Sequence, residues 1–417
     1  SQSWRSPSES DLMNFERLDN LGIATFDRLR LLLDPIAPPT DLEPIMMAVG
    51  EPQHAYPDLV GDTMHANRHL YGKYPLLLGT GEYREAVAEW LNWRYDLPAG
   101  MIDPGRHIVP LAGSREGLYL IAPTVVPESK SVGGRNLQPT ALVANPFYQV
   151  YAGASVFAGA ETVYVSATEE TGFLPDFAAL DEDILQRAAI AYVSNPTNPQ
   201  GAVADIDQLC DMIRLARKHD FLLIVDECYA EVYDNTPPPG ALEACVKIGG
   251  DPDHIMDNVL VFHSLSKRSS VPGLRVGFCA GDPVVLKRYL QFRSYSSPQI
   301  PLPILATGAA LWRENDHVAE SRSLYRHKID IAERILGSRY GFYRPPGGFF
   351  LWLKVGNGEE ATRRIWQEAA VRIVPGAYVC RTDHNGFNPG DPYIRIALVV
   401  DAATTETALQ RIVETLN

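Results

Sequence analysis

A lysine flanked by serines directly follows a short apolar run. The apolar run spans residues 258–262, and His263-Ser264-Leu265-Ser266-Lys267 comes next. A primary amine on a long flexible side chain can attack a carbonyl carbon, and nearby hydroxyls can donate hydrogen bonds to an anion. Taken alone, Lys267 could equally be a solvated loop cation, so its meaning depends on the residues that accompany it.

A second apolar run, residues 221–225, ends in a carboxylate, Asp226, with Tyr229 three residues later. An unpaired carboxylate at a buried strand end would be costly. A protonated heterocycle nitrogen facing Asp226 and a phenolic oxygen facing Tyr229 would satisfy both side chains. The ring of pyridoxal 5'-phosphate carries both groups, and its aldehyde requires a lysine.

Three further polar segments follow other apolar runs. Gly113-Ser114-Arg115 comes where a helix should begin, and helix N-termini bind phosphate, although an ordinary strand-to-helix turn would look alike. Tyr148 could stack on a ring or pack in a core. Asn198 lies between two Asn-Pro steps, where it could donate to a phenolic oxygen or belong to a plain double turn.

The apolar runs that must position these residues read as strands. They span residues 45–49, 107–111, 141–144, 188–194, 221–225, 258–262 and 275–281. Several are unbroken, as in strands covered on both faces, and residues 205–219 between two of them have helical spacing. We therefore predict an α/β fold in which helices cover a mostly parallel sheet, with ligands at the carboxyl ends of the strands.

Beyond residue 300 the pattern changes to long amphipathic helices, including residues 321–336 and a C-terminal helix carrying Leu409, Ile412, Val413 and Leu416. We expect a smaller α+β domain at 301–417 and a large cofactor-binding domain at 52–300. Residues 1–51, with a helical stretch at 26–34, should form an arm that joins the small domain.

Composition narrows the possible partners and compartment. The net charge is −14, from 37 basic and 51 acidic residues, which disfavours nucleic acid and anionic membranes as partners. Five cysteines have no metal-ligand spacing, so we expect no metal site and a reducing, cytoplasmic compartment. Residues 1–11 are polar where a signal peptide would be apolar, and no apolar run is long enough to span a membrane.

The candidate residues form one ordered set along nearly the whole chain. The set resembles the fold type I aminotransferases, which depend on pyridoxal phosphate and belong to the aspartate aminotransferase superfamily. Residues 110–120, 145–151, 226–233 and 263–282 further resemble the N-succinyl-diaminopimelate aminotransferase branch. The members of the set are Gly50-Glu51-Pro52, Tyr74 with Gly79, Gly113-Ser114-Arg115, Tyr148, Asn198, Asp226 with Tyr229, Ser264-Leu265-Ser266-Lys267, Arg275, Gly347-Gly348 and Arg395.

The resemblance implies a role for each residue at the cofactor ring. Lys267 bonds the cofactor covalently and then moves a proton as general base and acid. Asp226 keeps the ring nitrogen protonated, so that the ring can accept electrons. Tyr229 and Asn198 bond the phenolic oxygen, and Tyr148 stacks on the ring.

The resemblance also implies contacts to the phosphate and to the substrate. The phosphate is held by Gly113, Ser114, Arg115, Ser264, Ser266 and Arg275, and by Tyr74 from the second subunit of a homodimer. Arg395 clamps the substrate α-carboxylate as a planar fork, and Gly50 and Asn198 also contact the substrate. The residue for the substrate side chain is open, because residues 293–297 do not align clearly with the distal-carboxylate arginine of aspartate-specific relatives.

We expect an aminotransferase that moves an amino group from an acidic or succinylated amino acid to a 2-oxo acid such as 2-oxoglutarate. The alternatives within this superfamily are an aspartate or aromatic aminotransferase and a β-lyase. A cofactor-sensing transcription regulator is disfavoured because only about fifty residues precede Gly50, too few for the DNA-binding module that such regulators carry. A silent structural homologue is disfavoured because Lys267, Asp226 and Arg395 are all retained.

Overall fold

A computed structural model describes residues 15–417 of the chain. The polar segment at residues 1–11, on which the expectation of no export signal rests, lies outside the described residues. Within residues 15–417, none of the helices combines the length and the apolar character that a membrane crossing needs. The expected cytoplasmic location stays a prediction.

A seven-stranded sheet forms the centre of the larger lobe. All its strands run parallel except β10, which is antiparallel to both neighbours. This confirms the predicted mostly parallel sheet. In spatial order the strands are β2 (Ile108–Leu111), β10 (Gly277–Gly281), β9 (Val259–Ser264), β8 (Leu222–Asp226), β7 (Ala188–Ser194), β5 (Thr140–Asn145) and β6 (Glu161–Ser166).

Helices cover both faces of this sheet, which explains the unbroken apolar runs of its inner strands. Every residue of β5 and β8 is buried. The helices of one face are α4 (Gly81–Tyr95), α8 (Ile206–His219), α9 (Ala241–Ile248) and α12 (Leu302–Arg313). Those of the other face are α5 (Ser114–Val125), α6 (Gln149–Phe157) and α11 (Pro283–Ser296).

Helix α8 shows how local sequence sets the element bounds. Asp205 accepts from the backbone N–H of Gln208, while the Gln208 side chain accepts from the Asp205 N–H, so a capping box starts the helix. Leu209 and Ile213 are fully buried on its inner face. The helix ends at Asp220, which takes a left-handed conformation with φ +52°. The predicted helix at 205–219 is confirmed.

The strand β6 was not predicted, because its burial alternates instead of forming an unbroken run. It lies at one edge of the sheet, next to β5 alone. An alternating strand of six residues is a weak signal beside the longer runs. The small hairpin of β3 (Lys130–Val132) and β4 (Arg135–Leu137) was also not predicted.

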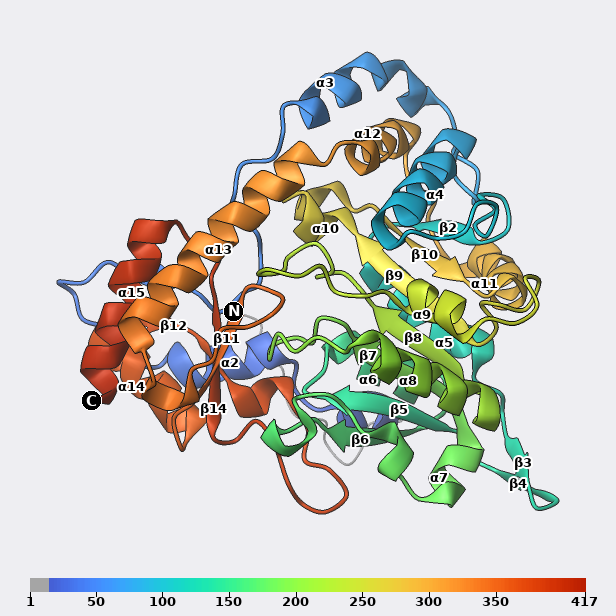
Figure 1. Cartoon of the computed structure of the whole chain (residues 1–417). Coiled ribbons are helices and arrows are strands. Elements are labelled where there is room, and N and C mark those ends of the chain that lie inside the picture. Colours follow the sequence, from blue (N-terminus) through green and yellow to red (C-terminus); the bar gives the residue numbers. More distant parts are fainter. Residues whose placement is uncertain (1–14) are drawn as a thin grey trace.

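The smaller lobe contains a three-stranded antiparallel sheet of β11 (Phe350–Lys354), β14 (Tyr393–Ala397) and β13 (Val374–Pro375). A two-stranded parallel pair, β1 (Ile45–Met46) with β12 (Val371–Arg372), joins residues from the two ends of the chain. Helices α13 (Asp316–Leu336), α14 (Gly358–Ala369) and α15 (Ala402–Leu416) pack against these strands, apart from the large sheet (Figure 1).

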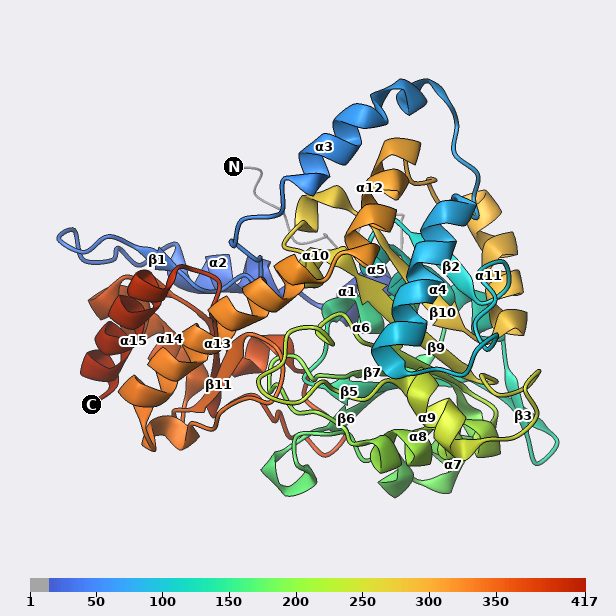
Figure 2. The same cartoon turned by 45° about the horizontal axis from the view of Figure 1, so that its top comes forward.

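The amino-terminal arm contacts both lobes. Helix α1 (Glu16–Leu21) packs on α6 of the large lobe. Helix α2 (Thr25–Leu33) packs on α14 and on the 3₁₀ turn Gly376–Val379 of the small lobe. Figure 2 shows α2 and β1 beside the C-terminal elements. The arm therefore passes from one lobe to the other near the carboxyl ends of the large sheet.

The division of the chain between the lobes differs in detail from the expected boundary at residue 300. Helix α12 packs against α4, and its Leu305 and Trp312 belong to the core of the large sheet. The packing partner changes only within α13, which runs from α12 toward the small lobe (Figure 1). The remaining α-helices within residues 15–417 are α3 (Leu59–Ala66), α7 (Glu182–Arg187) and α10 (Leu265–Arg268).

Candidate active site

A cavity of about 510 Å³ opens at the carboxyl ends of the parallel strands. Segments that follow β2, β5, β7, β8 and β9 all contribute to its wall, as the rule for open α/β sheets requires. Because β10 is antiparallel, its amino end lies at the same edge and brings Arg275 into the cavity. The predicted residues that line it are Gly50, Ser114, Arg115, Tyr148, Asn198, Asp226, Tyr229, Ser264, Ser266, Lys267, Arg275 and Arg395.

Two of the residues with a predicted role at the cofactor or the substrate do not line the cavity. Gly113 lies directly before Ser114 as the N-cap of α5. Tyr74 is 98% exposed in the single chain. The role expected for Tyr74 is a contact to the cofactor of a second subunit, so that role stays a prediction.

Lys267 lies in the short helix α10 and its side chain faces the cavity. Its Nζ donates a hydrogen bond to the carbonyl oxygen of Gly50 and lies 5.9 Å from the centre of the Tyr229 ring. Desolvation lowers the pKa of Lys267 to about 8, and the positive charge of Arg395 acts in the same direction. The uncharged share of this amine at neutral pH is therefore much larger than for a lysine with the usual pKa of 10.5.

Asp226 ends β8 and is 6% exposed. Its Oδ2 accepts from the Tyr151 hydroxyl at 2.5 Å, and its Oδ1 accepts from the backbone N–H of Cys228 at 3.1 Å. Tyr151 also stacks on Tyr192, with ring centres 4.8 Å apart. We did not predict Tyr151 from the sequence, although it lies one helical turn beyond Tyr148 and so could share its face of α6.

Arg395, in the middle of β14, is a buried cation without an ionic partner among residues 15–417. Its Nη2 donates to the carbonyl oxygen of Ala48 at 2.8 Å, and its guanidinium lies 4.6 Å from the centre of the Phe350 ring. Its Nε is buried without a hydrogen-bond partner. Burial lowers the pKa of Arg395 to about 10, so the charge persists at neutral pH and is available to an anionic ligand.

Hydroxyls, a guanidinium and a helix N-terminus meet at one end of the cavity. Ser114 begins α5, a helix of 12 residues. The Ser264 hydroxyl donates to Ser266 Oγ at 2.9 Å, and Arg275 Nη1 donates to the Pro272 carbonyl at 2.8 Å. The arrangement suits a phosphate, because hydroxyls, a positive charge and a helix N-terminus line the same cavity.

Gly113 leaves the room in which Arg275 lies. A Cβ on Gly113 would stand 2.1 Å from Nη2 of Arg275, and the Gly113 φ of +79° is a conformation that side chains disfavour. The glycine is therefore required both by its backbone and by the arginine that packs against it.

Arg115 is tied to Tyr148 and does not point freely into the cavity. Its Nε donates to the Tyr148 hydroxyl at 2.6 Å, and its guanidinium lies 5.6 Å from the Tyr148 ring centre. The contact holds two cavity-lining side chains together. A direct contact between Arg115 and a phosphate stays a prediction.

Arg293, the first residue of the segment considered for distal-carboxylate recognition, is not free for that purpose. It is 1% exposed, pairs with Glu116 Oε1 at 3.0 Å and donates to the Pro110 carbonyl at 2.9 Å. Its charge is used inside its own subunit. Tyr295, in contrast, is 89% exposed.

Part of the cavity wall was not predicted from the sequence. Thr25 and Phe26 come from the N-terminal arm, Phe173 and Pro175 from the loop after β6, and Val379 from the small lobe. Phe173 has a φ of +59° and stacks on Tyr343, with ring centres 5.4 Å apart. These residues carry no chemical signature, and only the tertiary structure brings them to the cavity.

Comparisons with known proteins identify what the chain is similar to. Residues 44–412 match the family model described as aminotransferase class I and II. The chain is 29% identical over 384 residues to the LL-diaminopimelate aminotransferase of Nitratidesulfovibrio vulgaris strain Hildenborough, covering 88% of this chain and 90% of that protein. A crystal structure of an aminotransferase from Neisseria meningitidis has a TM-score of 0.89 and 36% identity, covering 96% of this chain and all (100%) of the other. The aminotransferase AspB from Helicobacter pylori has a TM-score of 0.86 and 33% identity, with coverages of 97% and 100%.

The residues of the cavity fit pyridoxal 5'-phosphate. The cavity volume of about 510 Å³ lies within the range of small-molecule sites. Nε of Arg395, a donor, is buried without a hydrogen-bond partner among the described residues. Polar groups left unpaired at a cavity wall are the ones a polar ligand satisfies. Lys267, Asp226 and the serines with Arg275 all line this one cavity.

Replacing Gly113 by Ala should weaken cofactor binding while the fold is kept, because the new methyl group must displace Arg275. Backbone strain and the clash together should lower the affinity for pyridoxal phosphate about tenfold or more. Spectroscopic titration of the apoprotein measures this change.

Gly100→Ala is the matched control. Gly100 has a φ of +81° but no atom within 4 Å of the added Cβ, so it introduces the strain without the clash. Equal loss of cofactor affinity in the two variants would contradict the role given to Gly113.

Proposed function

The chain belongs to the class I and II aminotransferase family and uses pyridoxal 5'-phosphate, and from this premise we propose which of its residues carry out the transfer. Lys267 holds the cofactor covalently and afterwards moves the proton that must leave and return during transamination. The single observation that carries this assignment is that Lys267 and Arg395, two cations without ionic partners among the described residues, line the same cavity.

When bound, the cofactor supplies an electron-accepting ring that makes the α-proton of an amino acid removable. Lys267 Nζ suits the proton transfer because its pKa of about 8 lies near neutral pH. Asp226 faces the ring nitrogen with a charge that Tyr151 and the Cys228 N–H stabilise. Burial raises the pKa of Tyr229 well above its usual value, so its hydroxyl remains a donor for the phenolic oxygen.

Arg395 orients the substrate by its α-carboxylate, together with Gly50 and Asn198. Every amino acid and 2-oxo acid in the two half-reactions carries this carboxylate, so one clamp serves both. Ala48 and Gly50 already accept from Arg395 and Lys267 through their carbonyls. The segment 48–50 therefore lies between the two cations that the substrate meets.

For the amino donor we favour an acidic or succinylated amino acid, with 2-oxoglutarate as the acceptor. The motif resemblance to the N-succinyl-diaminopimelate branch supports this choice, and so do the curated relatives named for LL-diaminopimelate. The charged residues that line the cavity are Arg115, Asp226, Lys267, Arg275 and Arg395. Four of them serve the ring, the phosphate and the α-carboxylate, and Arg115 is bonded to Tyr148. We therefore expect a residue of the second subunit to bind the distal carboxylate of the substrate.

We further propose that the active unit is a homodimer in which Tyr74 reaches the phosphate of the other subunit. Large apolar side chains are exposed near it: Leu76 is 75% exposed and Tyr71 is 56% exposed. A patch of this kind is typical of a protein interface. Each cavity would then be completed by its neighbour.

Borohydride reduction of the holoenzyme, followed by peptide mapping, should place the cofactor on Lys267. The chain offers an internal control, because Lys328 is also buried and also has a pKa lowered to about 8. Lys328 binds His54 and the Leu398 carbonyl outside the cavity, so it should stay unlabelled. A label on another lysine refutes the assignment.

Single-turnover mixing of the holoenzyme with individual amino acids then tests the donor. N-succinyl-LL-diaminopimelate, glutamate and LL-diaminopimelate should convert the bound cofactor to its aminated form faster than aromatic amino acids do. Release of ammonia and a 2-oxo acid without conversion would indicate a β-lyase.

Arg395→Lys should lower kcat/KM for every donor and acceptor by about 10- to 150-fold, as expected for the loss of one charge-assisted hydrogen bond. Lysine keeps the charge but loses the planar fork. Affinity for the cofactor should barely change. Steady-state kinetics with two donors and one acceptor measure the effect.

Arg344→Lys is the control for this substitution. Arg344 binds both oxygens of Asp234 at 2.8 Å, outside the cavity. The Arg344→Lys substitution should lower thermal stability and leave KM unchanged. If Arg395→Lys impaired one substrate alone, the clamp would not bind the shared carboxylate.

A further inference from the structure

The backbone ladder between β8 and β9 ends where the active-site segments begin. The paired residues run from Leu223 with Val259 to Asp226 with Phe262. The last bond is donated by the Glu227 N–H to the Phe262 carbonyl at 2.9 Å. Beyond this point the chain after β8 turns away, and β9 continues to Ser264 paired only with β10. No further backbone bond in the β8–β9 ladder fixes the spacing of the two segments.

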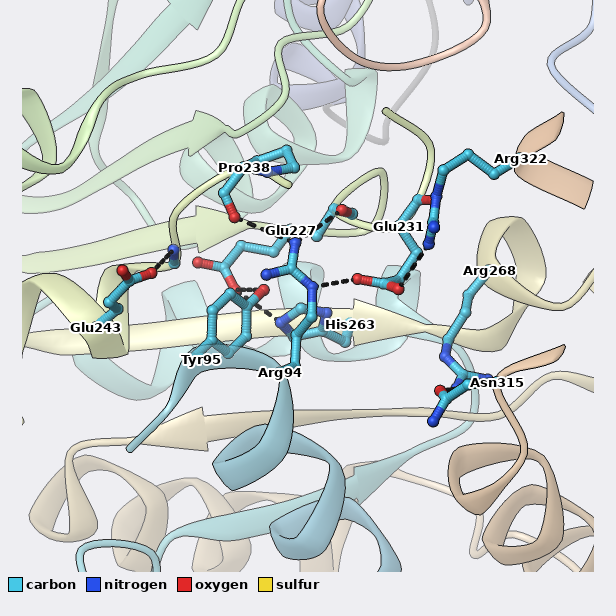
Figure 3. A network of polar contacts seen from close by, with 12 residues as sticks. Arg94, Tyr95, Glu227, Glu231, Pro238, Glu243, His263, Arg268, Asn315 and Arg322 are labelled. Carbon is cyan, nitrogen blue, oxygen red and sulfur yellow. Dashed lines mark hydrogen bonds and ion pairs between the residues drawn. The ribbon is translucent and has the colours of Figure 1, made fainter. Parts of the chain in front are cut away.

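A side-chain bond connects the two strands at the next position. The His263 Nε2–H donates to Glu227 Oε2 at 2.7 Å, and the two side chains are only 3% and 1% exposed. Figure 3 shows this contact at the centre of a polar network. Glu227 directly follows Asp226, and His263 directly precedes Ser264. Neither side chain lines the cavity, because neighbouring residues of a strand point to opposite faces.

The remaining bonds of Glu227 fix it in one position. Its Oε2 also accepts from the Tyr95 hydroxyl at 3.1 Å, and its Oε1 accepts from the Ala241 N–H at 2.7 Å. The carboxylate thus has donors from α4, α9 and β9. A buried carboxylate with every oxygen paired is rigid, because any movement leaves a donor or the charge unsatisfied in a low-dielectric interior.

The imidazole of His263 is held just as firmly, by aromatic side chains. It stacks on Phe278 of β10, with ring centres 5.0 Å apart and planes 20° apart. Trp90 of α4 packs edge-on at 5.1 Å. The ring can therefore neither rotate nor shift without breaking close packing.

We propose that Glu227 and His263 are positioning residues that set the separation between Asp226 with Tyr229 on one side and Ser264 to Lys267 on the other. The pair continues the connection between β8 and β9 past the last backbone bond. The inference rests on the roles proposed above for Asp226, Tyr229 and Lys267. If those residues must hold one ring at the same time, a small change in spacing weakens all their contacts together.

The same network contains a second buried pair that serves as a control. Glu231 is 6% exposed and pairs with Arg94 of α4, whose side chain is 8% exposed, and with Arg322 of α13 at 3.1 Å. Figure 3 shows both pairs together. Glu231 joins a loop to two helices, and none of these three side chains lines the cavity or stands next to a residue that does.

The test compares Glu227→Gln and His263→Gln with Glu231→Gln in the full-length protein. For each variant, apoprotein titration gives the dissociation constant for pyridoxal phosphate, a pH titration gives the midpoint of the visible cofactor band, and thermal unfolding gives Tm. Glu227→Gln and His263→Gln should raise the dissociation constant about tenfold and move the pH midpoint. Glu231→Gln should lower Tm about as much as the other two variants do, but it should leave the dissociation constant and the midpoint unchanged.

A milder variant covers the case in which Glu227→Gln does not fold. Tyr95→Phe removes one of the three donors to Glu227. It should shift the pH midpoint in the same direction as His263→Gln does, but by a smaller amount. Equal dissociation constants and midpoints for the Glu227, His263 and Glu231 variants, or an unshifted midpoint in Tyr95→Phe, would overturn the inference. In each variant, borohydride mapping shows separately whether Lys267 still holds the cofactor. A wrong role for Lys267 is thereby distinguished from a wrong role for the Glu227–His263 pair.

Discussion

Positive charge without an ionic partner is the constraint on which this structure depends. Lys267 and Arg395 line one cavity, and neither forms an ion pair with a carboxylate within residues 15–417. Instead they donate to the carbonyls of Gly50 and Ala48. Holding a cation at a buried site costs free energy unless a ligand supplies the opposite charge or reacts with the amine. A substrate carboxylate supplies the opposite charge to Arg395, and a cofactor aldehyde reacts with the amine of Lys267.

The architecture brings these charges together by a simple rule. Parallel strands end at one edge of the sheet, so the segments after β2, β5, β7, β8 and β9 meet there although they are far apart in the chain. The second lobe adds Arg395 from β14, and the crossing segment at residues 48–50 accepts from both cations. The buried network behind the strands then sets the spacing with which the parts meet, since backbone bonds stop at Glu227.

The sequence predicted the parts of the structure that have a local signature. Unbroken apolar runs identified the inner strands, because those strands are buried on both faces. Polar residues after several of these runs, such as Asp226 and Lys267, lie in the cavity wall. The alternating edge strand β6 was not predicted. Phe26 and Phe173 were not predicted either, since their contribution depends on tertiary contacts that no spacing encodes. Tyr151 was missed although it lies one helical turn beyond Tyr148. The burial of Arg293 against Glu116 likewise follows only from packing.

The most direct test of the account is the pKa of Lys267 in the apoprotein. The rate at which 1-fluoro-2,4-dinitrobenzene modifies Lys267, followed by peptide mapping over a range of pH, reports the fraction of uncharged amine. We expect a midpoint near pH 8, moving upward in Arg395→Leu because one neighbouring positive charge is removed. A midpoint at the ordinary lysine value of 10.5, unchanged in that variant, would contradict it.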